Sequence, residues 1–447
     1  MSLSNKPMTT FLEEVAADLY QRYGRDVSRL RILFPSRRAQ LFFTDALSRQ
    51  TDAPIWQPQF ESIDRIMTSI TGLEHGERVR LITELYIVYR QFHQEEKFDK
   101  FYFWGEMLLS DFDSIDKYLI DADILFSNIS ELKQIESDLS YITDRQWEVI
   151  NRFWSVLNDD KSPSDHKKRF LKIWQSLCPI YHRFKARLRE LGIAYGGMIQ
   201  REAVERIAES DFVLDDGGAG YVIAGFNALS TCEKRLFDYL SKNRQTDFYW
   251  DYDNYYLNDQ QEAGLFLREN RLRYPQRELF AAQVDNFTAR EKSLTAVAAA
   301  SNVLQCKYVN HLLREMIERG VPMDKRTAIV LTDENLLQPL LYSMPEGIEL
   351  NVTMGLPLRQ TVAYSLVERL IELQSRRRES SNGVWYHNTD VLGLLAHPYL
   401  NNLFADDAKR LSAEILKRQR VNVPREELAV TPLLEKLFAP VAEWSAM

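Results

Sequence analysis

The chain has 447 residues, of which 45% are hydrophobic and 12% aromatic, so it can bury several apolar cores and is not a disordered protein. Its 56 basic side chains are outnumbered by 64 acidic ones, which gives a formal net charge of -8. This balance excludes a uniformly basic coat for nucleic acid, and any nucleic-acid surface must be a local patch.

The first elements are a helix, a strand and a second helix. Thr10 and Glu13 have the spacing of a capping box, and the apolar stripe that follows ends at Gly24. The apolar run at residues 30–34 predicts a strand buried on both faces, as in a parallel sheet. Ser36 is then suited to cap the next helix. We expect residues 29–47 to form the opening half of a βαβ unit.

The pattern becomes helical from residue 77 to about residue 208, with an expected loop at residues 158–166. The aromatic residues at positions 98–104 fit either a helical core or a partner surface. Strands are predicted again at residues 221–224 and 246–250, before a charged, loop-rich stretch.

A new block of strands and helices is predicted after residue 292. Its strands are expected at residues 294–300, 326–331 and 349–354, with a helix at residues 303–319. From residue 362 onward the pattern is helical, apart from a polar interruption at residues 376–383.

Three segments of the sequence resemble one protein family. LFPSRRAQLFFTDAL, YVIAGFNALSTCEKRLFDYL and NVTMGLPLRQTVAYSLVERLIELQ, which begin at Leu33, Tyr221 and Asn351, are similar to segments of the AddB family. These proteins are helicase–nuclease subunits of the UvrD/RecB type with a degenerate motor, and the large AddB-like PD-(D/E)XK nuclease proteins of Bacteroidetes carry very similar segments.

The resemblance implies an α/β fold with two RecA-like parallel-sheet cores (the P-loop NTPase fold), each with a helical insert, as in superfamily-one helicases. The first core would comprise residues 1–75 and 211–290, interrupted by a helical insert at residues 76–210. The second core would begin at residues 291–361. Residues 362–447 would form a helical subdomain that continues beyond this chain.

The resemblance also implies a role in double-strand-break repair by recombination. The expected partners are single-stranded or forked duplex DNA and a helicase–nuclease subunit similar to AddA. A PD-(D/E)XK exonuclease domain that uses Mg²⁺ is expected C-terminal to Met447. For this chain alone we expect no cofactor and no catalytic activity.

The sequence lacks the residues of an ATP site. A phosphate-binding loop requires the pattern GxxxxGK[ST], which occurs nowhere in the chain. The carboxylate that would hold Mg²⁺ at the end of the matching strand is replaced by Ala224, which cannot bind a metal. An active helicase with an atypical nucleotide site and a protein-interaction module without DNA binding remain as alternatives.

The candidate DNA-binding residues lie after strands or in mixed basic and aromatic stretches. For each of them, a structural or solvated role is the alternative to contact with phosphate or bases. The candidates are Ser36, Arg37, Arg38, Phe226, Asn227, Arg271, Arg273 and Tyr274.

Metal chemistry and a membrane location are not expected. Asp251 and Asp253 could be paired metal ligands, but polar residues that end a strand are the simpler interpretation. Cys178, Cys232 and Cys306 lie far apart, which predicts neither a disulfide framework nor a zinc site. No apolar run reaches ~18 residues and no signal peptide is visible, so a cytoplasmic location is expected.

Overall fold

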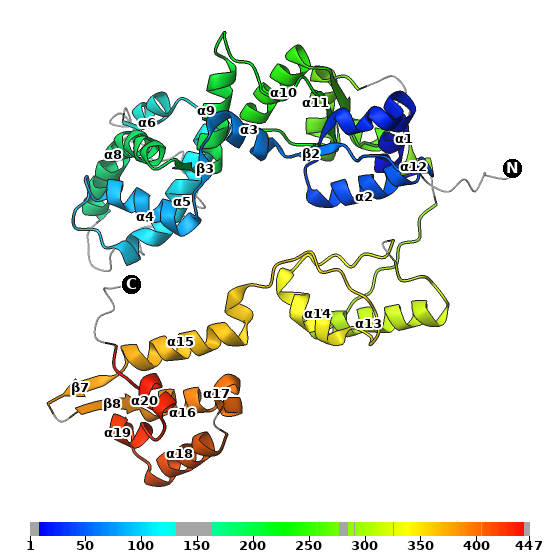
Figure 1. Ribbon diagram of the computed structural model, residues 1–447. Helices are drawn as coiled ribbons and strands as arrows, with labels where there is room; N and C mark the ends of the chain where they lie inside the picture. Colours follow the sequence, from blue (N-terminus) through cyan, green and yellow to red (C-terminus); the bar gives the residue numbers. More distant parts are fainter. Residues whose placement is uncertain are drawn as a thin grey trace. The chain divides into compact units, whose positions relative to one another are not determined.

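A computed structural model describes residues 9–130, 163–258, 260–276, 285–289, 291–324, 326–381, 383–403 and 405–441. The chain divides into two compact units, Met1–Lys292 and Ser293–Met447, each with its own elements (Figure 1). Within the described ranges, no helix is long and apolar enough to cross a bilayer.

The first unit contains a four-stranded parallel sheet with the strand order β2-β1-β5-β6. The strands are β2 (Gln59–Glu61), β1 (Leu30–Leu33), β5 (Gly220–Ala224) and β6 (Thr246–Tyr249). The predicted strands at β1, β5 and β6 are confirmed. β2 was not predicted, because three residues are too few to display an alternating pattern.

Apolar clusters cover both faces of this sheet. Val222 and Ala224 of β5 belong to a cluster with α1 (Phe11–Tyr23) and α2 (Arg37–Ser48). Tyr221 and Ile223 point to the opposite face, where the cluster includes α3 (Ile63–Thr71) and α10 (Thr231–Asn243). The alternation of side chains along a strand therefore produces the two-sided burial expected of a parallel sheet.

Short polar motifs set the starts of the helices around the sheet. Thr10 and Glu13 form the predicted capping box of α1, and Ser62 caps α3. Ser230 and Glu233 form a second capping box at the start of α10. α1 ends at Gly24, whose φ of 53° is a conformation that glycine adopts easily.

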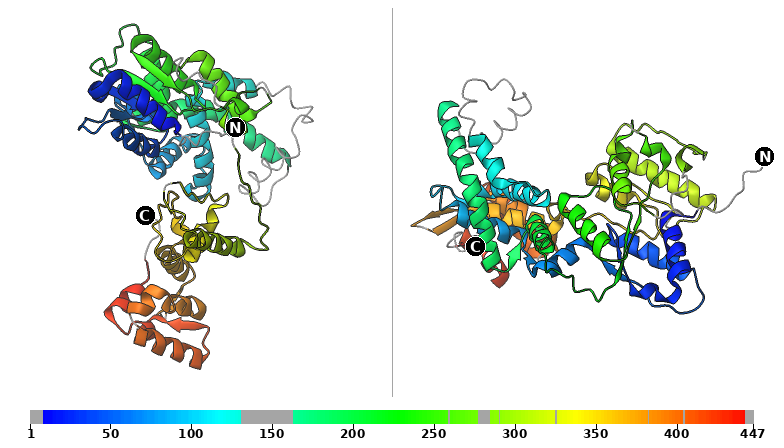
Figure 2. Two further views of the ribbon diagram at one scale, coloured as in Figure 1. Left: turned by 90° about the vertical axis from the view of Figure 1, so that its right-hand side faces the viewer. Right: turned by 90° about the horizontal axis from the view of Figure 1, so that it is seen from above.

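A helical segment lies between β2 and β5 in the sequence, although β1 and β5 are neighbours in the sheet. Its helices pack into one apolar cluster with α3, and α8 is the longest of them at 28 residues (Figure 2). The elements are β3 (Glu74–His75), α4 (Arg78–Tyr89), α5 (Phe98–Lys117), α6 (Ala122–Ser130), α8 (Pro163–Glu190), β4 (Ile193–Ala194) and α9 (Gly196–Ile207).

Two predictions for this segment, the loop at residues 158–166 and the role of the aromatic residues at positions 98–104, can be compared with the structure. The loop predicted at residues 158–166 lies partly outside the described residues, and α8 already begins at Pro163. Among the aromatic residues at positions 98–104, Phe101 is buried and its ring lies 4.7 Å from that of Tyr89, which supports the core interpretation. Phe103, in contrast, is exposed.

A buried carboxylate ties three helices of the segment together. Asp116 of α5 is fully buried and lies 3.0 Å from Nζ of Lys185 in α8. It also accepts hydrogen bonds of 2.5 Å from the hydroxyls of Tyr181 in α8 and Tyr195 at the start of α9. Arg201 of α9 makes a second ion pair with the same carboxylate. Because Lys185 and Arg201 face one carboxylate from different helices, the helices have a defined register.

The first unit ends with α11 (Leu265–Arg273) and the short α12 (Asn286–Ala289). The second unit begins with α13 (Asn302–Glu318) and α14 (Leu337–Ser343), which pack against each other. Its remaining helices surround an antiparallel sheet and a separate apolar core. In chain order, these helices and strands are α15 (Val362–Ser375), β7 (Arg378–Ser380), β8 (Gly383–His387), α16 (Asn388–Leu395), α17 (Pro398–Leu403), α18 (Ala405–Arg418), β9 (Asn422–Pro424), α19 (Arg425–Leu428) and α20 (Pro432–Leu437).

The second parallel sheet expected from the sequence is not found among the described residues. Residues 294–300, 326–331 and 349–354 form no strand, and the side chains of Leu294 and Val330 are 93% and 84% exposed. A short apolar run becomes a strand only where neighbouring strands satisfy its backbone and cover its faces, which is not the case here. The strands that do form in this unit, β7, β8 and β9, were not predicted.

Candidate nucleic-acid interface

The carboxyl ends of the four parallel strands meet at one edge of the sheet of the first unit. The loop after β1 and the loop after β5 are in contact there. A Cβ atom placed on Gly225 would lie 3.9 Å from Cδ of Pro35 and 3.7 Å from the ring of Phe11. The start of α1, the start of α2 and the loop after β5 therefore share this edge, where ligands of open α/β sheets bind.

The start of α2 is basic. Ser36 caps the helix by accepting a hydrogen bond of 3.3 Å from the backbone N–H of Ala39. Arg37 and Arg38 follow in the first turn, which contains no acidic residue, and both side chains are exposed. Within the described part of the chain, neither guanidinium makes an ion pair. Two free cations and the positive end of a helix dipole thus face solvent at the same place.

The start of α1 has the opposite character. Its first turn contains Glu13 and Glu14, and the capping box uses the side chains of Thr10 and Glu13 to satisfy backbone N–H groups. In a nucleotide site these N–H groups would face phosphate. Ala224, where an acidic metal ligand would be needed, is fully buried in the apolar cluster. This edge consequently offers a place for an anion at α2 and not at α1.

The loop after β5 presents one polar residue and hides the aromatic one. Phe226 is buried and its ring packs at 5.5 Å against that of Phe237, so its predicted role as a stacking platform for bases is wrong. The ring turns inward because the core between β5 and α10 is built from aromatic side chains. Asn227 is exposed, and its carbonyl oxygen accepts a hydrogen bond of 2.6 Å from Asn270 of α11.

The basic and aromatic residues of α11 are engaged within the protein. Nε of Arg273 lies 3.0 Å from Oδ1 of Asp238, and the guanidinium of Arg271 lies 4.0 Å from the ring centre of Tyr252. Tyr274 is buried, stacks at 4.8 Å on Phe248 and donates a hydrogen bond to Asp238.

Tyr274 therefore packs on α10 and β6, and its predicted role as a stacking platform for bases is wrong. Arg273 is exposed although it is paired with Asp238, so its contact with DNA stays a prediction. Arg271 keeps partial exposure. Of the eight candidate residues, Ser36, Arg37, Arg38 and Asn227 remain exposed at the carboxyl edge of the sheet.

Two carboxylates near the end of β6, those of Asp247 and Asp253, have structural partners. Asp247 lies 2.7 Å from a guanidinium nitrogen of Arg22. Asp253 accepts hydrogen bonds from the backbone N–H groups of Tyr255 at 3.0 Å and Phe287 at 2.8 Å. This geometry favours the turn-forming interpretation over a metal site. In the part of the chain that the structure describes, the metal-binding side chains that approach one another are instead Asp123, Cys178 and His182, in α6 and α8.

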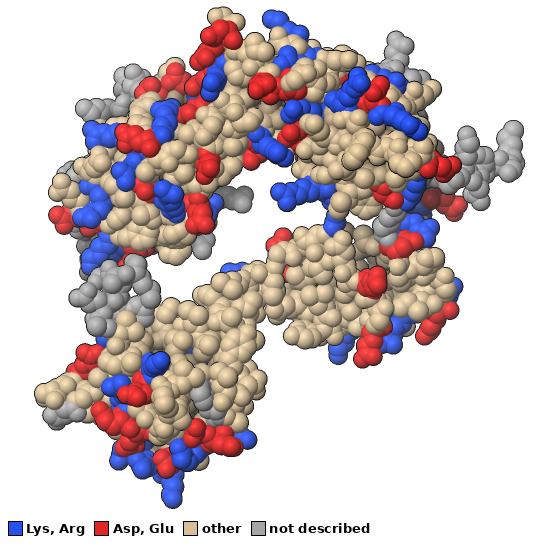
Figure 3. All heavy atoms as spheres, viewed as in Figure 1, with Lys and Arg blue, Asp and Glu red and all other residues tan. Residues whose placement is uncertain are grey.

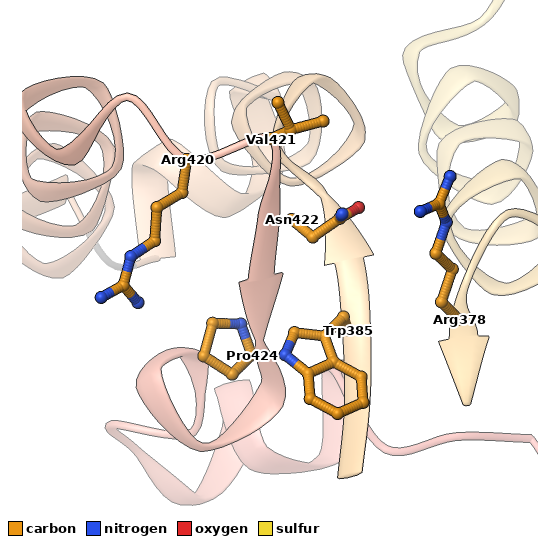
Figure 4. A pocket seen from close by; sticks show the side chains of 6 residues that line it. All are labelled: Arg378, Trp385, Arg420, Val421, Asn422 and Pro424. Atoms are coloured by element: carbon orange, nitrogen blue, oxygen red, sulfur yellow. The ribbon is translucent and has the colours of Figure 1, made fainter. Parts of the chain in front are cut away.

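A second candidate surface lies on the antiparallel sheet of the second unit. Arg378 of β7 is the register partner of Trp385 in β8, which is in turn the partner of Pro424 in β9. Neighbours in this register place their side chains on one face of a sheet. Together with Arg420 they line an open hollow of about 450 Å³, in which the indole ring lies between the two arginines (Figure 4).

The two arginines of this hollow differ in their charge environment. Arg420 lies 2.7 Å from Glu427, whereas Arg378 is exposed and makes no ion pair with any described residue. Arg378 differs in this respect from the two arginines that precede it, because Arg376 and Arg377 pair with Asp390 and Glu379. Trp385 was not predicted, although the β-branched and aromatic run at residues 384–386 could have indicated a strand.

No protein-family model matches this chain, and the search of curated proteins found no match either.

Proposed function

We propose that this chain is a DNA-binding scaffold with a helicase-like first core that does not hydrolyse ATP, similar to the N-terminal half of AddB. In this proposal, it holds single-stranded or forked DNA during double-strand-break processing and works beside a motor subunit similar to AddA. The parallel sheet, whose strands β2 and β5 are separated in the sequence by a long helical segment, supports the proposal, because such an architecture is expected of a protein similar to AddB. The finer part of the proposal, a second RecA-like core, rests on the sequence resemblance alone.

The observation that carries the proposal is the pair Arg37 and Arg38 at the start of α2. They are exposed, free of ion pairs with described residues, and placed beyond the carboxyl end of a central strand. Phosphate contacts in protein–DNA complexes come from arginine side chains and from helix N-termini, and both are present here. The exposed Asn227 adds a hydrogen-bonding group on the adjacent loop.

The same edge supports the proposed lack of ATP hydrolysis. Glu13 and Glu14 place negative charge at the start of α1, where triphosphate would be repelled. The sequence contains no GxxxxGK[ST] loop, and Ala224 provides no oxygen for Mg²⁺. These residues disfavour the alternative of an active helicase with an atypical nucleotide site.

The hollow around Trp385 supports single-stranded DNA as the ligand. An accessible indole ring can stack on any base, and flanking arginines can neutralise the backbone on either side. Arg378 and Arg420 flank the ring in this way (Figure 4).

Binding of labelled DNA at low salt tests the proposal. We expect single-stranded and forked oligonucleotides to bind the 447-residue chain, as measured by fluorescence anisotropy, and to bind more weakly as the salt concentration rises. In a parallel melting experiment, Mg²⁺–ATP should leave the melting temperature unchanged, since a ligand that binds the native state must raise it. No detectable DNA binding at low salt would refute the scaffold function, and an ATP-dependent increase in melting temperature would refute the loss of the nucleotide site.

A second candidate function, docking of a protein partner, is favoured by α15. One face of this helix packs on the core of the second unit through Leu366, Leu370 and Leu373. The opposite side exposes the apolar side chains of Tyr364, Val367 and Ile371, although Glu368 and Glu372 are exposed on the same helix. Figure 3 shows few charged side chains on the visible face over α14 and α15, unlike the mixed charges on α18.

The two candidate functions can be separated by variants of this helix. Val367→Asp with Ile371→Asp should abolish co-purification of an AddA-like subunit expressed with the chain, while DNA binding stays unchanged. Matched aspartates at two exposed apolar positions of α17 and α18, Leu403 and Leu416, serve as the control. Unchanged co-purification of the α15 variant would remove this helix from the docking surface.

A further inference from the structure

Three side chains with metal-binding atoms converge between α6 and α8 of the helical segment, two helices that lie side by side in Figure 1. Asp123 lies in the first turn of α6. Cys178 and His182 are four residues apart in α8, so they lie one turn apart on the same side of that helix. The two helices pack against each other directly. A thiol, an imidazole and a carboxylate thus approach from two elements that are distant in the sequence.

The distances fit one shared ion. Oδ1 of Asp123 lies 3.0 Å from Sγ of Cys178 and 3.0 Å from Nε2 of His182, and all three ligand atoms are within 4.8 Å of one another. Ligand atoms held about 2.1 Å from a tetrahedral ion are separated by about 3.4 Å. The two separations that involve Asp123 are 3.0 Å, and the third, between Cys178 and His182, is at most 4.8 Å. A small widening at Asp123 is therefore enough to admit the ion.

The packing beside the cluster holds its members in place. The ring of Phe126 in α6 lies 6.1 Å from that of Trp174 in α8 and 6.5 Å from that of Tyr181, next to His182. The hydroxyl of Tyr181 is itself fixed by its 2.5 Å hydrogen bond to the buried Asp116. The register of α8 against α6 is set by these contacts, and the ligand atoms do not have to be brought together by the metal.

We propose that Asp123, Cys178 and His182 form a site for Zn²⁺ or a similar borderline divalent metal ion. A thiolate and an imidazole select zinc over Mg²⁺ or Ca²⁺, which prefer ligand sets made only of oxygen. Three protein ligands leave a fourth position for water, and the side chains of Asp123 and His182 are more than half exposed, which gives an ion direct access.

No zinc site was expected from the sequence, because the three cysteines lie far apart along the chain. That argument did not consider that Cys178 and His182 are four residues apart, which places two types of metal ligand on one face of a helix. The third ligand, Asp123, is 55 residues away from Cys178 in the sequence. Only the packing of α6 on α8 brings it to the other two.

Metal titration of the tag-free 447-residue chain tests the proposal. Co²⁺ replaces Zn²⁺ in such sites and gives a thiolate-to-cobalt charge-transfer absorption band. We expect this band at one equivalent, its displacement by Zn²⁺, and a melting temperature that rises with Zn²⁺. Cys178→Ser should abolish the band, and His182→Ala should weaken Zn²⁺ binding by roughly two orders of magnitude.

The controls are a cysteine and a histidine outside the cluster. Cys306→Ser and His311→Ala, both in α13, should retain the band and the affinity of the parent chain. The proposal is overturned if the parent chain shows no charge-transfer band, or if the band and the affinity survive both Cys178→Ser and His182→Ala. Asp123→Asn, an exposed and nearly isosteric change, repeats the test should either of those variants unfold.

Discussion

The side chain of Ser36 accepts a hydrogen bond of 3.3 Å from the backbone N–H of Ala39, and this contact starts α2 immediately beyond the carboxyl end of β1. It places Arg37 and Arg38 in the first helical turn, at the edge shared with the loop after β5. Ser36 therefore determines where the exposed guanidinium groups of Arg37 and Arg38 lie. The proposed DNA contact depends on that position.

Replacement of Ser36 by alanine should lower the free energy of unfolding by about 1 kcal/mol, because an N–H group at the start of α2 loses its partner. Urea denaturation measures the change. Ser48→Ala, in the last turn of the same helix, removes a hydroxyl that bonds only to the carbonyl of Asp45 and should have little effect. Equal losses in the two variants would contradict the role of Ser36 as a cap.

Removal of the indole ring at Trp385 should weaken binding of single-stranded DNA by about 1–3 kcal/mol, the usual contribution of one stacked base. Anisotropy titration of Trp385→Ala measures the loss. Trp56→Ala is the matched control, since Trp56 is also accessible but lies in the loop before β2. If both variants bind like the parent chain, the hollow on the antiparallel sheet is not a DNA contact.

Asp116→Ala should destabilise the first unit by about 3–5 kcal/mol, because Lys185 would remain buried without its counter-charge and Arg201 would lose the closer of its two carboxylates. Lys117→Ala provides the comparison one residue away. It breaks an ion pair with Asp113 that is partly solvated, and its effect should stay below about 1 kcal/mol. Similar denaturation midpoints for the two variants would show that the buried network is not a main source of stability.

Asp216 makes the stability of the first unit dependent on acid. Burial opposes its charge, but the hydrogen bonds from Arg244, from the N–H of Gly218 and from Tyr221 outweigh that effect and lower the pKa of this carboxyl below its ordinary value. A carboxyl with a lowered pKa in the folded state binds a proton more readily when unfolded. Its contribution is therefore complete above the unfolded pKa of about 3.9 and disappears as the pH falls through the lower folded value.

The corresponding measurement compares the parent chain with Asp216→Asn by denaturation across the acid range. The difference in unfolding free energy should be constant near neutrality and should shrink below about pH 4. Asp26→Asn, which alters an exposed pair with Arg29, should show no such trend. A difference for Asp216→Asn that persists unchanged to about pH 2 would contradict the linkage.

Local signals in the sequence predicted the elements of the first unit well. Thr10 and Ser36 were recognised as caps because capping is decided by residues three positions apart. β1 and β5 were recognised because both of their faces are apolar. Local signals could not predict the orientation of Phe226 or the ion pair of Arg273 with Asp238. Both depend on how α10 and α11 pack in the apolar cluster on one face of the sheet.

In the second unit, local sequence signals did not predict the strands correctly. Residues 294–300 and 326–331 have the composition of strands, but a strand also needs a neighbour, and composition does not provide one. Conversely, β8 contains the strand-forming residues Val384, Trp385 and Tyr386, but it lies in a region whose overall pattern was helical. The approach of Asp123 to Cys178 required the packing of two helices and could not be deduced from spacing.

The most direct test of the DNA-binding scaffold is the salt dependence of binding to single-stranded DNA for Arg37→Gln with Arg38→Gln. Each phosphate contact adds about 0.7 to the slope of log K against log salt concentration, so the loss of two contacts should reduce the slope by about 1.4. Arg25→Gln with Arg29→Gln makes the same charge change in Gly24–Arg29, at the opposite end of β1, and should leave the slope unchanged. Equal slopes for the two double variants would contradict the assignment of Arg37 and Arg38 to the DNA backbone.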